Sequence, residues 1–266
     1  MSLALRTFAS AADASAALKE EGARYLGGGT LVVRAVNEGD VAITGYVRAT
    51  DPALSGIEVS GRRVRIGASV TMTSIVGHPE LEAINRAAKA VGGPAIRNMA
   101  TVGGNLFAAA PYGDFTVALQ ALDATVHCAG GDMNIGTFLA SREDAPERGI
   151  VTAVSFDIPA ADSFRFRKVS RVKPKGVSVL SIAAVIESDA QGLVTAARIS
   201  MGCMADRPMR ALSAEKALVG SQLTEIGIAE AVAVIGEGTD PVTDPVASAW
   251  YRGEVLPVHF SRLLLG

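Results

Sequence analysis

Apolar and polar positions along the chain predict short helices and strands that follow one another without regular alternation. An alanine-rich stretch begins after Ser10 and ends at Gly22, which is typical of a helix closed by glycine. Residues 64–70 alternate apolar and polar side chains and predict a half-buried strand. Pro79 suits the first turn of a helix, and apolar residues at steps of three and four continue that helix to a stop at residues 92–94.

Strand patterns dominate the middle of the chain. Residues 124–135 predict a hairpin that turns at two glycines, and residues 150–159 predict a strand. Two long β-rich runs, residues 176–188 and 192–203, are joined by DAQG and predict an antiparallel hairpin. Three helical stretches are expected after it: Met209–Val219, Thr224–Gly236, and a stretch from Pro245 with interruptions at Gly253 and Pro257.

We therefore expect the α+β class, because a doubly wound parallel sheet would need strands and helices in strict alternation. The short, polar segment at residues 159–163 predicts a boundary between two domains. The N-terminal domain would cover residues 1–160, with subdomains of about 1–52 and 53–160. The C-terminal domain, residues 161–266, would combine a three-stranded antiparallel sheet with a helical bundle.

Composition and charge exclude several classes of protein. The chain has 266 residues and a formal net charge of -2, whereas a nucleic-acid partner would require a basic face. We find no apolar run long enough to span a membrane and no apolar signal-peptide core, so we expect a cytoplasmic protein. Cys128 and Cys203 are too few for an iron–sulfur cluster and are expected as buried thiols. The three histidines, His78, His127 and His259, are widely separated and predict no metal site.

Two glycine loops are the strongest candidates for chemistry. Residues 27–30, GGGT, lie between a predicted strand at residues 23–26 and a predicted helix at residues 31–39. A second loop, TVGGN at residues 101–105, is followed by Asp114. Backbone N–H groups at such turns can bind a phosphate, and glycine permits its close approach. Neither loop has the glycine spacing of a Rossmann or P-loop motif, and tight turns in a packed core remain the alternative.

Together these motifs resemble the flavin-binding medium subunit of the molybdenum hydroxylases, the family of carbon monoxide dehydrogenase and xanthine dehydrogenase. The family pattern is a GGT-type loop, then T-[IV]-GG-N, then a short segment that ends in Asp. Residues 164–172, 197–220 and 244–265 are similar to the C-terminal domain of that subunit. The resemblance covers nearly the whole chain in the expected order.

The resemblance implies FAD as the cofactor of this chain and assigns its site residues. Backbone N–H groups of the first loop would surround the diphosphate, and the second loop would approach the diphosphate and the flavin. Many relatives carry Ser or Asp where Leu31 stands, so any side-chain contact from that position is lost. The implied loop residues are Gly27, Gly28, Gly29, Thr30, Leu31, Thr101, Val102, Gly103, Gly104 and Asn105.

Two charged residues complete the implied site. Asp114 would face the ribose or adenine, although the residues alone equally favour a helix cap. Lys168 matches a basic position near the flavin, and neighbouring Arg167 is the alternative. Both lie in a basic run, residues 165–175, which would otherwise be a solvated strand edge. No catalytic residue and no metal ligand is assigned in this chain.

The function implied by the resemblance is electron transfer within a larger oxidoreductase. A large molybdopterin-binding subunit would oxidise the substrate, and a small subunit with 2Fe-2S clusters would pass electrons to the FAD held here. The FAD would then reduce a terminal acceptor, in an assembly expected to be a dimer of heterotrimers. Two alternatives stay open, namely a stand-alone flavin-dependent oxidoreductase and a non-catalytic nucleotide-binding protein.

Overall fold

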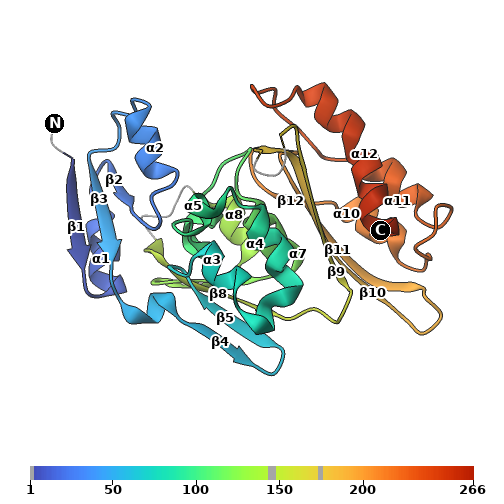
Figure 1. The fold of residues 1–266 in the computed structure, drawn as a ribbon, viewed down its shortest axis with the longest axis horizontal. Coiled ribbons are helices and arrows are strands. Elements are labelled where there is room, and N and C mark those ends of the chain that lie inside the picture. The colour runs from blue at the N-terminus through green and yellow to red at the C-terminus, as the bar shows by residue number, and fades with distance from the viewer. Residues whose placement is uncertain (1–2, 143–147, 173–175) are drawn as a thin grey trace.

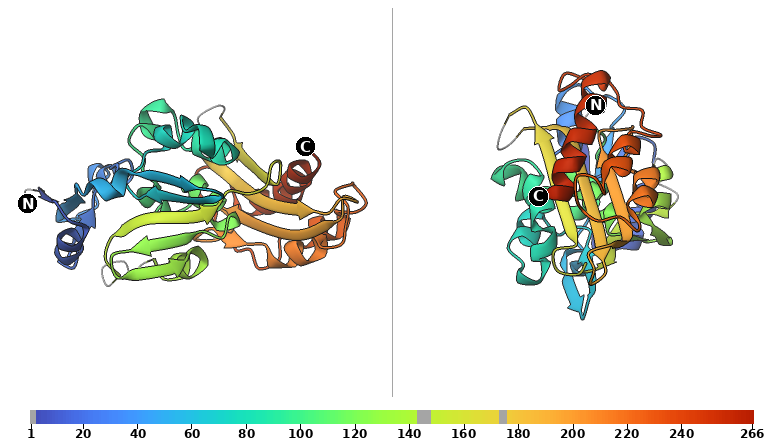
Figure 2. Two further views of the ribbon diagram at one scale, coloured as in Figure 1. Left: turned by 90° about the horizontal axis from the view of Figure 1, so that it is seen from below. Right: turned by 90° about the vertical axis from the view of Figure 1, so that its right-hand side faces the viewer.

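In a computed structural model, which describes residues 3–142, 148–172 and 176–266, the chain forms three sheets with helices packed between and beside them. Figures 1 and 2 show the sheets following one another along the long axis, with the N-terminus at one end and the C-terminal helices at the other. The expected α+β class is confirmed. Among the described residues, no helix is long and apolar enough to cross a membrane.

The first sheet is small and parallel. Its strands lie in the order β1-β3-β2, with bounds β1 (Ala4–Phe8), β3 (Gly45–Ala49) and β2 (Ala23–Tyr25). Helix α1 (Ala11–Ala17) begins where predicted, because Ser10 accepts a hydrogen bond from the Asp13 N–H and caps it. Helix α2 (Val32–Asn37) confirms the helix expected after the first glycine loop.

The second sheet is antiparallel and carries the largest core. Its order is β4-β5-β8-β6-β7, with bounds β4 (Ile57–Ser60), β5 (Arg63–Gly67), β8 (Val151–Asp157), β6 (Thr125–Cys128) and β7 (Gly131–Asn134). The predicted hairpin is β6–β7, and the predicted strands at residues 64–70 and 150–159 are β5 and β8. Alternate residues of these strands, such as Val64, Ile66 and Val154, are fully buried in that core.

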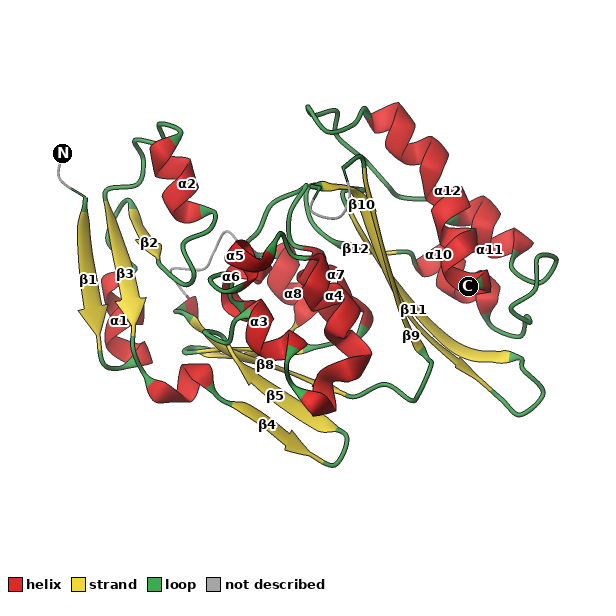
Figure 3. Cartoon of the chain, viewed as in Figure 1, coloured by secondary structure: helices red, strands yellow, loops and turns green. Residues whose placement is uncertain are grey.

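Short helices cover the apolar face of the second sheet (Figure 3). They are α3 (Met72–Val76), α4 (Asn85–Ala90), α5 (Pro94–Arg97), α6 (Val102–Leu106), α7 (Asp114–Ala121) and α8 (Ile135–Ala140), with 3-10 turns at Pro52–Ser55 and Pro79–Ile84. Pro79 begins a 3-10 turn that leads into α4 with non-helical geometry at Leu81, so the helix predicted there is divided.

The third sheet is antiparallel, in the order β12-β11-β10-β9. Its strands are β9 (Phe164–Ser170), β10 (Ser178–Ser188), β11 (Val194–Gly202) and the two-residue β12 (Met209–Arg210). The predicted long hairpin is therefore β10–β11. Strand β10 is buried on both faces, since Leu180 and Ile182 join the core under the C-terminal helices whereas Ala183 and Val185 join the core of the second sheet.

Helices α10 (Leu212–Leu218), α11 (Ala229–Val234) and α12 (Ala249–Leu265) complete the C-terminal part. Two sequence predictions are wrong here. Met209 pairs with Met201 in the sheet and does not begin a helix. Helix α12 continues through Gly253 and Pro257, because Leu256, Phe260 and other apolar residues bury one face of it, which outweighs the missing N–H of proline.

Candidate functional site

The first glycine loop leaves strand β2 and enters helix α2. The Leu26 N–H still pairs with the carbonyl of Val47, at 2.7 Å, and the backbone then turns at Gly29, whose φ of +74° favours glycine. Within the described chain, the N–H groups of residues 27–31 make no hydrogen bond. The sequence prediction of strand, glycine turn and helix is confirmed, and the turn carries a run of free donors.

The second loop is fixed to the end of strand β5. The N–H groups of Val102 and Gly103 donate to the carbonyls of Val70 and Ala68, at 2.9 and 2.8 Å. A Cβ atom on Gly103 would lie only 2.9 Å from the Ala68 Cβ, so this contact requires glycine. Val102 and Gly103 therefore anchor the loop and have no N–H left for a ligand.

Thr101 caps the short helix that contains the rest of this loop. Its Oγ1 accepts a hydrogen bond from the Gly104 N–H at 3.1 Å. Asn105 follows; the residue is 6% exposed, and its Oδ1 has no hydrogen-bond partner among the described residues. A buried acceptor without a partner usually marks a site that a ligand or an ordered water completes.

The two loops meet although about 70 residues separate them. A Cβ on Gly28 would lie 1.7 Å from the carbonyl oxygen of Met99, and a Cβ on Gly27 would lie 2.9 Å from Thr101 Oγ1. Figure 3 shows the loop before α2 beside α5 and α6. The glycines thus allow a backbone-to-backbone approach that brings the free N–H groups of the first loop next to Thr101 and Asn105.

Asp114 lies at the start of α7, but it is not the cap of that helix. The cap position belongs to Gly113, whose φ of +87° is left-handed, and no side chain caps the helix. Asp114 Oδ1 instead accepts from the Ser178 hydroxyl at 2.6 Å, and Oδ2 accepts from Lys168 Nζ at 2.8 Å. The helix-cap interpretation is wrong, because both carboxylate oxygens point toward the third sheet.

Lys168 and Arg167 lie on opposite faces of strand β9. Lys168 Nζ donates to Asp114 and, at 2.9 Å, to the carbonyl of Ala90 at the end of α4. Arg167 Nε donates to His259 Nδ1 on α12, at 3.2 Å. Lys168 is therefore an ion-paired, largely buried residue, and the solvated-edge interpretation is wrong for it. Lys173 and Lys175 of the basic run lie outside the described residues.

The buried thiols predicted for Cys128 and Cys203 are confirmed. Burial, followed by the nearby negative charge of Asp114, raises the pKa of the Cys203 thiol to about 12. Across the described parts of the chain, no group of three or more His, Cys, Asp or Glu side chains could hold a metal ion.

Comparison with known families assigns both parts of the chain. Residues 4–160 match the FAD binding domain in molybdopterin dehydrogenase, and residues 165–266 match the CO dehydrogenase flavoprotein C-terminal domain. The chain belongs to the FAD-binding medium subunits of the molybdenum hydroxylases. It is an oxidoreductase subunit, and FAD is its cofactor.

Similar proteins cover most of this flavoprotein subunit. The nicotinate dehydrogenase FAD-subunit of Eubacterium barkeri is 30% identical over 80% of this chain and 76% of its own length. The carbon monoxide dehydrogenase medium chain of Afipia carboxidovorans is 29% identical over 79% of this chain and 76% of its own length. Reconstituted CO dehydrogenase from Oligotropha carboxidovorans is 27% identical with a TM-score of 0.88, over 99% of this chain and 96% of that chain. Quinoline 2-oxidoreductase from Pseudomonas putida 86, 23% identical with a TM-score of 0.88, shares the fold.

Sequence reasoning missed two contacts near the loops of this flavoprotein subunit. The Arg34 guanidinium donates to the Tyr112 hydroxyl at 2.5 Å and so joins α2 to the segment between α6 and α7. Ser178 binds Asp114 from the start of β10. Neither contact has a local sequence signal, because each joins residues more than 60 positions apart.

Proposed function

We propose that the subunit binds FAD where its two glycine loops meet. The observation that carries the proposal is the approach of Gly27 and Gly28 to residues 99–101, at distances that exclude a side chain. The free N–H donors of the first loop fit the diphosphate of such a cofactor. Asn105 Oδ1 of the second loop, which has no partner among the described residues, fits a hydrogen-bond donor of the cofactor.

Each loop has a separate role in this proposal. The N–H groups of Gly27, Gly28, Gly29, Thr30 and Leu31 donate to the diphosphate, and the Leu31 side chain is not needed for that. Thr101 and Asn105 face the cofactor from the second loop, and Gly104, which is exposed, leaves room for it. Val102 and Gly103 hold the second loop in place through their bonds to Val70 and Ala68.

Asp114 and Lys168 supply the charged side of the site. Lys168 lies beside the flavin, where its positive charge favours the reduced form of the ring. Asp114 faces the ribose with the lone pairs that its bonds to Lys168 and Ser178 leave free. Residues 1–160, with subdomains 1–52 and 53–160, form the FAD-binding domain, and residues 161–266 form the C-terminal domain that contributes Lys168; the two family matches support this division.

The proposed role of the loaded subunit is electron transfer. Bound FAD supplies the redox chemistry, and the chain supplies binding, orientation and the local charge. The chain has only two cysteines, so clusters that deliver electrons would belong to a small 2Fe-2S subunit, and a large molybdopterin subunit would oxidise the substrate. We place the complex in the cytoplasm as a dimer of heterotrimers. The medium-chain and subunit names of the relatives support a multi-subunit assembly.

The first experiment tests the cofactor site. The purified chain is mixed with FAD, its absorption spectrum is recorded after gel filtration, and the released cofactor is identified by chromatography. Stoichiometric FAD is expected, and Gly104→Val, whose side chain would enter the site from an exposed position, should lose FAD while keeping its fold. Gly56→Val is the control, because nothing lies within 4 Å of a Cβ at Gly56. Normal FAD content in Gly104→Val would contradict the loop assignment.

A second experiment tests electron transfer. The subunit is combined with the proposed small 2Fe-2S subunit and large molybdopterin subunit, and reduction of its FAD is followed after substrate is added to the complex. Reduction in the complex, and none in the isolated subunit, is the expected result. Full substrate oxidation by the isolated subunit would instead identify a stand-alone flavin-dependent oxidoreductase.

A further inference from the structure

Ser178 holds the carboxylate of Asp114 from a position that no ligand can reach. Its side chain is fully buried, and its hydroxyl donates to Asp114 Oδ1 at 2.6 Å. The other oxygen of the same carboxylate accepts from Lys168 Nζ at 2.8 Å. Both oxygens of the carboxylate are therefore held by hydrogen bonds. The bond from the Ser178 hydroxyl has the short length of a charge-assisted hydrogen bond.

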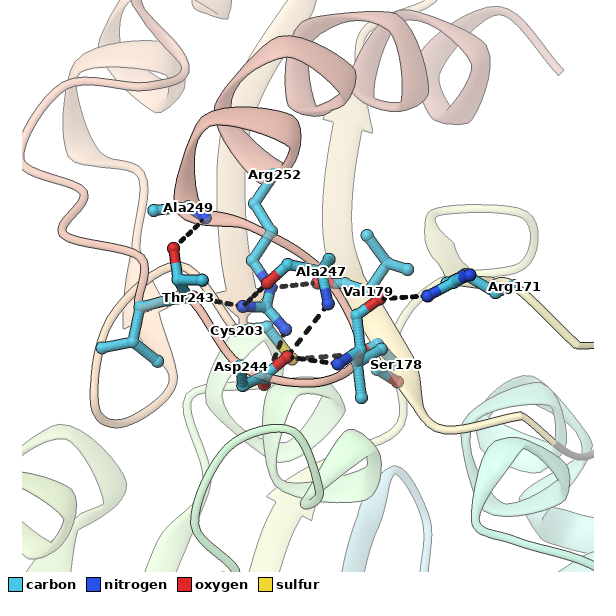
Figure 4. Close-up of polar contacts among 11 residues, drawn as sticks. Arg171, Ser178, Val179, Cys203, Thr243, Asp244, Ala247, Ala249 and Arg252 are labelled. Carbon is cyan, nitrogen blue, oxygen red and sulfur yellow. Dashed lines mark hydrogen bonds and ion pairs between the residues drawn. The ribbon is translucent and has the colours of Figure 1, made fainter.

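The backbone around Ser178 is fixed by a second buried cation. Arg252 of α12 is 1% exposed, and its Nε donates to the carbonyl of Val179 at 2.9 Å. The same guanidinium pairs with Asp244 at 2.8 Å, while Cys203 Sγ lies 3.7 Å from the carbonyl oxygen of Ser178 (Figure 4). The start of β10 is thus held by a contact from the C-terminal helix.

We infer that Ser178 is a positioning residue of the flavin site. Its hydroxyl holds the carboxylate of Asp114, and that carboxylate holds Lys168 Nζ. The position of this ammonium group determines the electrostatic potential at the bound FAD. Ser178 does not touch the cofactor and acts through the other two residues. The inference rests on the proposed function, which places Lys168 beside the flavin.

A lysine needs neighbouring groups to hold its ammonium in one position, because its side chain is long and flexible. Lys168 Nζ has two hydrogen-bond acceptors, the Ala90 carbonyl and Asp114, and only Asp114 carries a charge. An Asp114 carboxylate held at one oxygen could rotate and release the ammonium. The Ser178 bond prevents this rotation, since it leaves Oδ2 directed at Lys168.

The test uses Ser178→Ala, and Ser178→Cys as a variant that fills the same space with a weak donor. Ser200→Ala is the matched control, because Ser200 is equally buried and donates to Gln120 of the same helix α7 at 2.7 Å, without a link to Asp114. The first measurement needs no cofactor. The protein is acetylated briefly with acetic anhydride, and mass spectrometry compares the labelling of Lys168 with that of exposed Lys89. The second measurement is the reduction potential of FAD bound to each variant.

Both Ser178 variants should raise the labelling rate of Lys168 about tenfold, as expected when a charge-assisted contact is weakened. They should also shift the potential of bound FAD in the negative direction, as we expect for Lys168→Met, whereas Ser200→Ala should leave both values unchanged. Wild-type labelling and potential in the Ser178 variants would overturn the inference, as would equal changes in Ser200→Ala. An unchanged potential in Lys168→Met would contradict the proposed role of Lys168, and the labelling rates would still decide whether Ser178 positions it.

Discussion

Lys168 Nζ lies 2.8 Å from Asp114 Oδ2, although the two residues are 54 positions apart and belong to different family domains. Both side chains are largely buried, at 16% and 7% exposed. The pair joins helix α7 to strand β9, and it brings together the two charged residues that the sequence resemblance assigns to the flavin site.

Removing one member of this pair should be costly. Asp114→Ala leaves the Lys168 ammonium buried without a counter-charge, so the free energy of unfolding should fall by about 3 kcal/mol. A helix cap would cost only about 1 kcal/mol. Denaturant titration of the ligand-free protein measures the difference. In a double-mutant cycle with Lys168→Met, a coupling energy near zero would show that the two residues do not depend on each other.

Gly28 should tolerate no side chain. A Cβ at this position would lie 1.7 Å from a backbone oxygen, so Gly28→Ala must separate the two loops. We expect FAD affinity to fall at least about tenfold, a change of about 1.4 kcal/mol in binding free energy, as measured by fluorescence titration. Gly56→Ala, at a glycine with open space around it, is the control. Unchanged affinity in Gly28→Ala would mean that the loops need not touch for FAD to bind.

The buried Arg252–Asp244 pair should dominate the stability of the C-terminal part. Arg252→Met removes the counter-charge of Asp244 and one donor from each of the carbonyls of Val179 and Ala247, and should cost about 3–5 kcal/mol of unfolding free energy. Arg207→Met, which removes an exposed pair with Asp206, should cost less than about 1 kcal/mol. Denaturant titration measures both variants. Similar losses of unfolding free energy in the two would contradict the view that the Arg252–Asp244 pair contributes more because it is buried.

Asp244 should make this stability depend on pH. Burial alone would raise its pKa, but hydrogen bonds from the Ala247 N–H, Arg252 and the Val246 N–H outweigh that effect and hold the pKa below its usual value. A carboxyl with a lowered pKa stabilises the fold above its unfolded pKa of about 3.9. Its contribution should be lost as pH falls from about 4 through the folded value. The stability difference between wild type and Asp244→Asn, followed by urea titration from pH 7 to pH 3, should shrink in that interval; a constant difference would contradict the assignment.

The two thiols should be unreactive in the native protein. Burial and the charge of Asp114 raise the pKa of Cys203 to about 12, and burial also raises the pKa of Cys128, so almost no thiolate exists at pH 8. Ellman's reagent should therefore modify neither cysteine in the folded chain and both after unfolding in guanidinium. Rapid reaction in the folded state would show that one of these sites opens readily.

The sequence predicted elements whose signals are local. The glycine loop at residues 27–30, the hairpins β6–β7 and β10–β11, and the start of helix α1 after Ser10 follow from turn residues and periodicity. Gly253 and Pro257 disfavour a helix locally and therefore predict a break. Helix α12 is continuous because tertiary packing of its apolar face stabilises it, and local residue preferences do not include that packing.

The candidate site was only partly predictable for the same reason. The loops and Asp114 stand in recognisable motifs, and Lys168 was found by its place in a family pattern. Ser178, by contrast, is a serine at the start of a strand without any motif. Its relation to Asp114 depends on how α7 lies against β10, which no local pattern of residues encodes.

The two buried faces of β10 have a consequence for how the protein unfolds. Ala183 and Val185 belong to the core beneath α7, while Leu180 and Ile182, on the same strand, belong to the core beneath α12. Strand β10 therefore contributes to both cores. Unfolding of either core would displace this strand and expose apolar surface in the other core. The two family segments should therefore melt together in one calorimetric transition, and residues 1–160 expressed alone should be prone to aggregation through the uncovered face of α7.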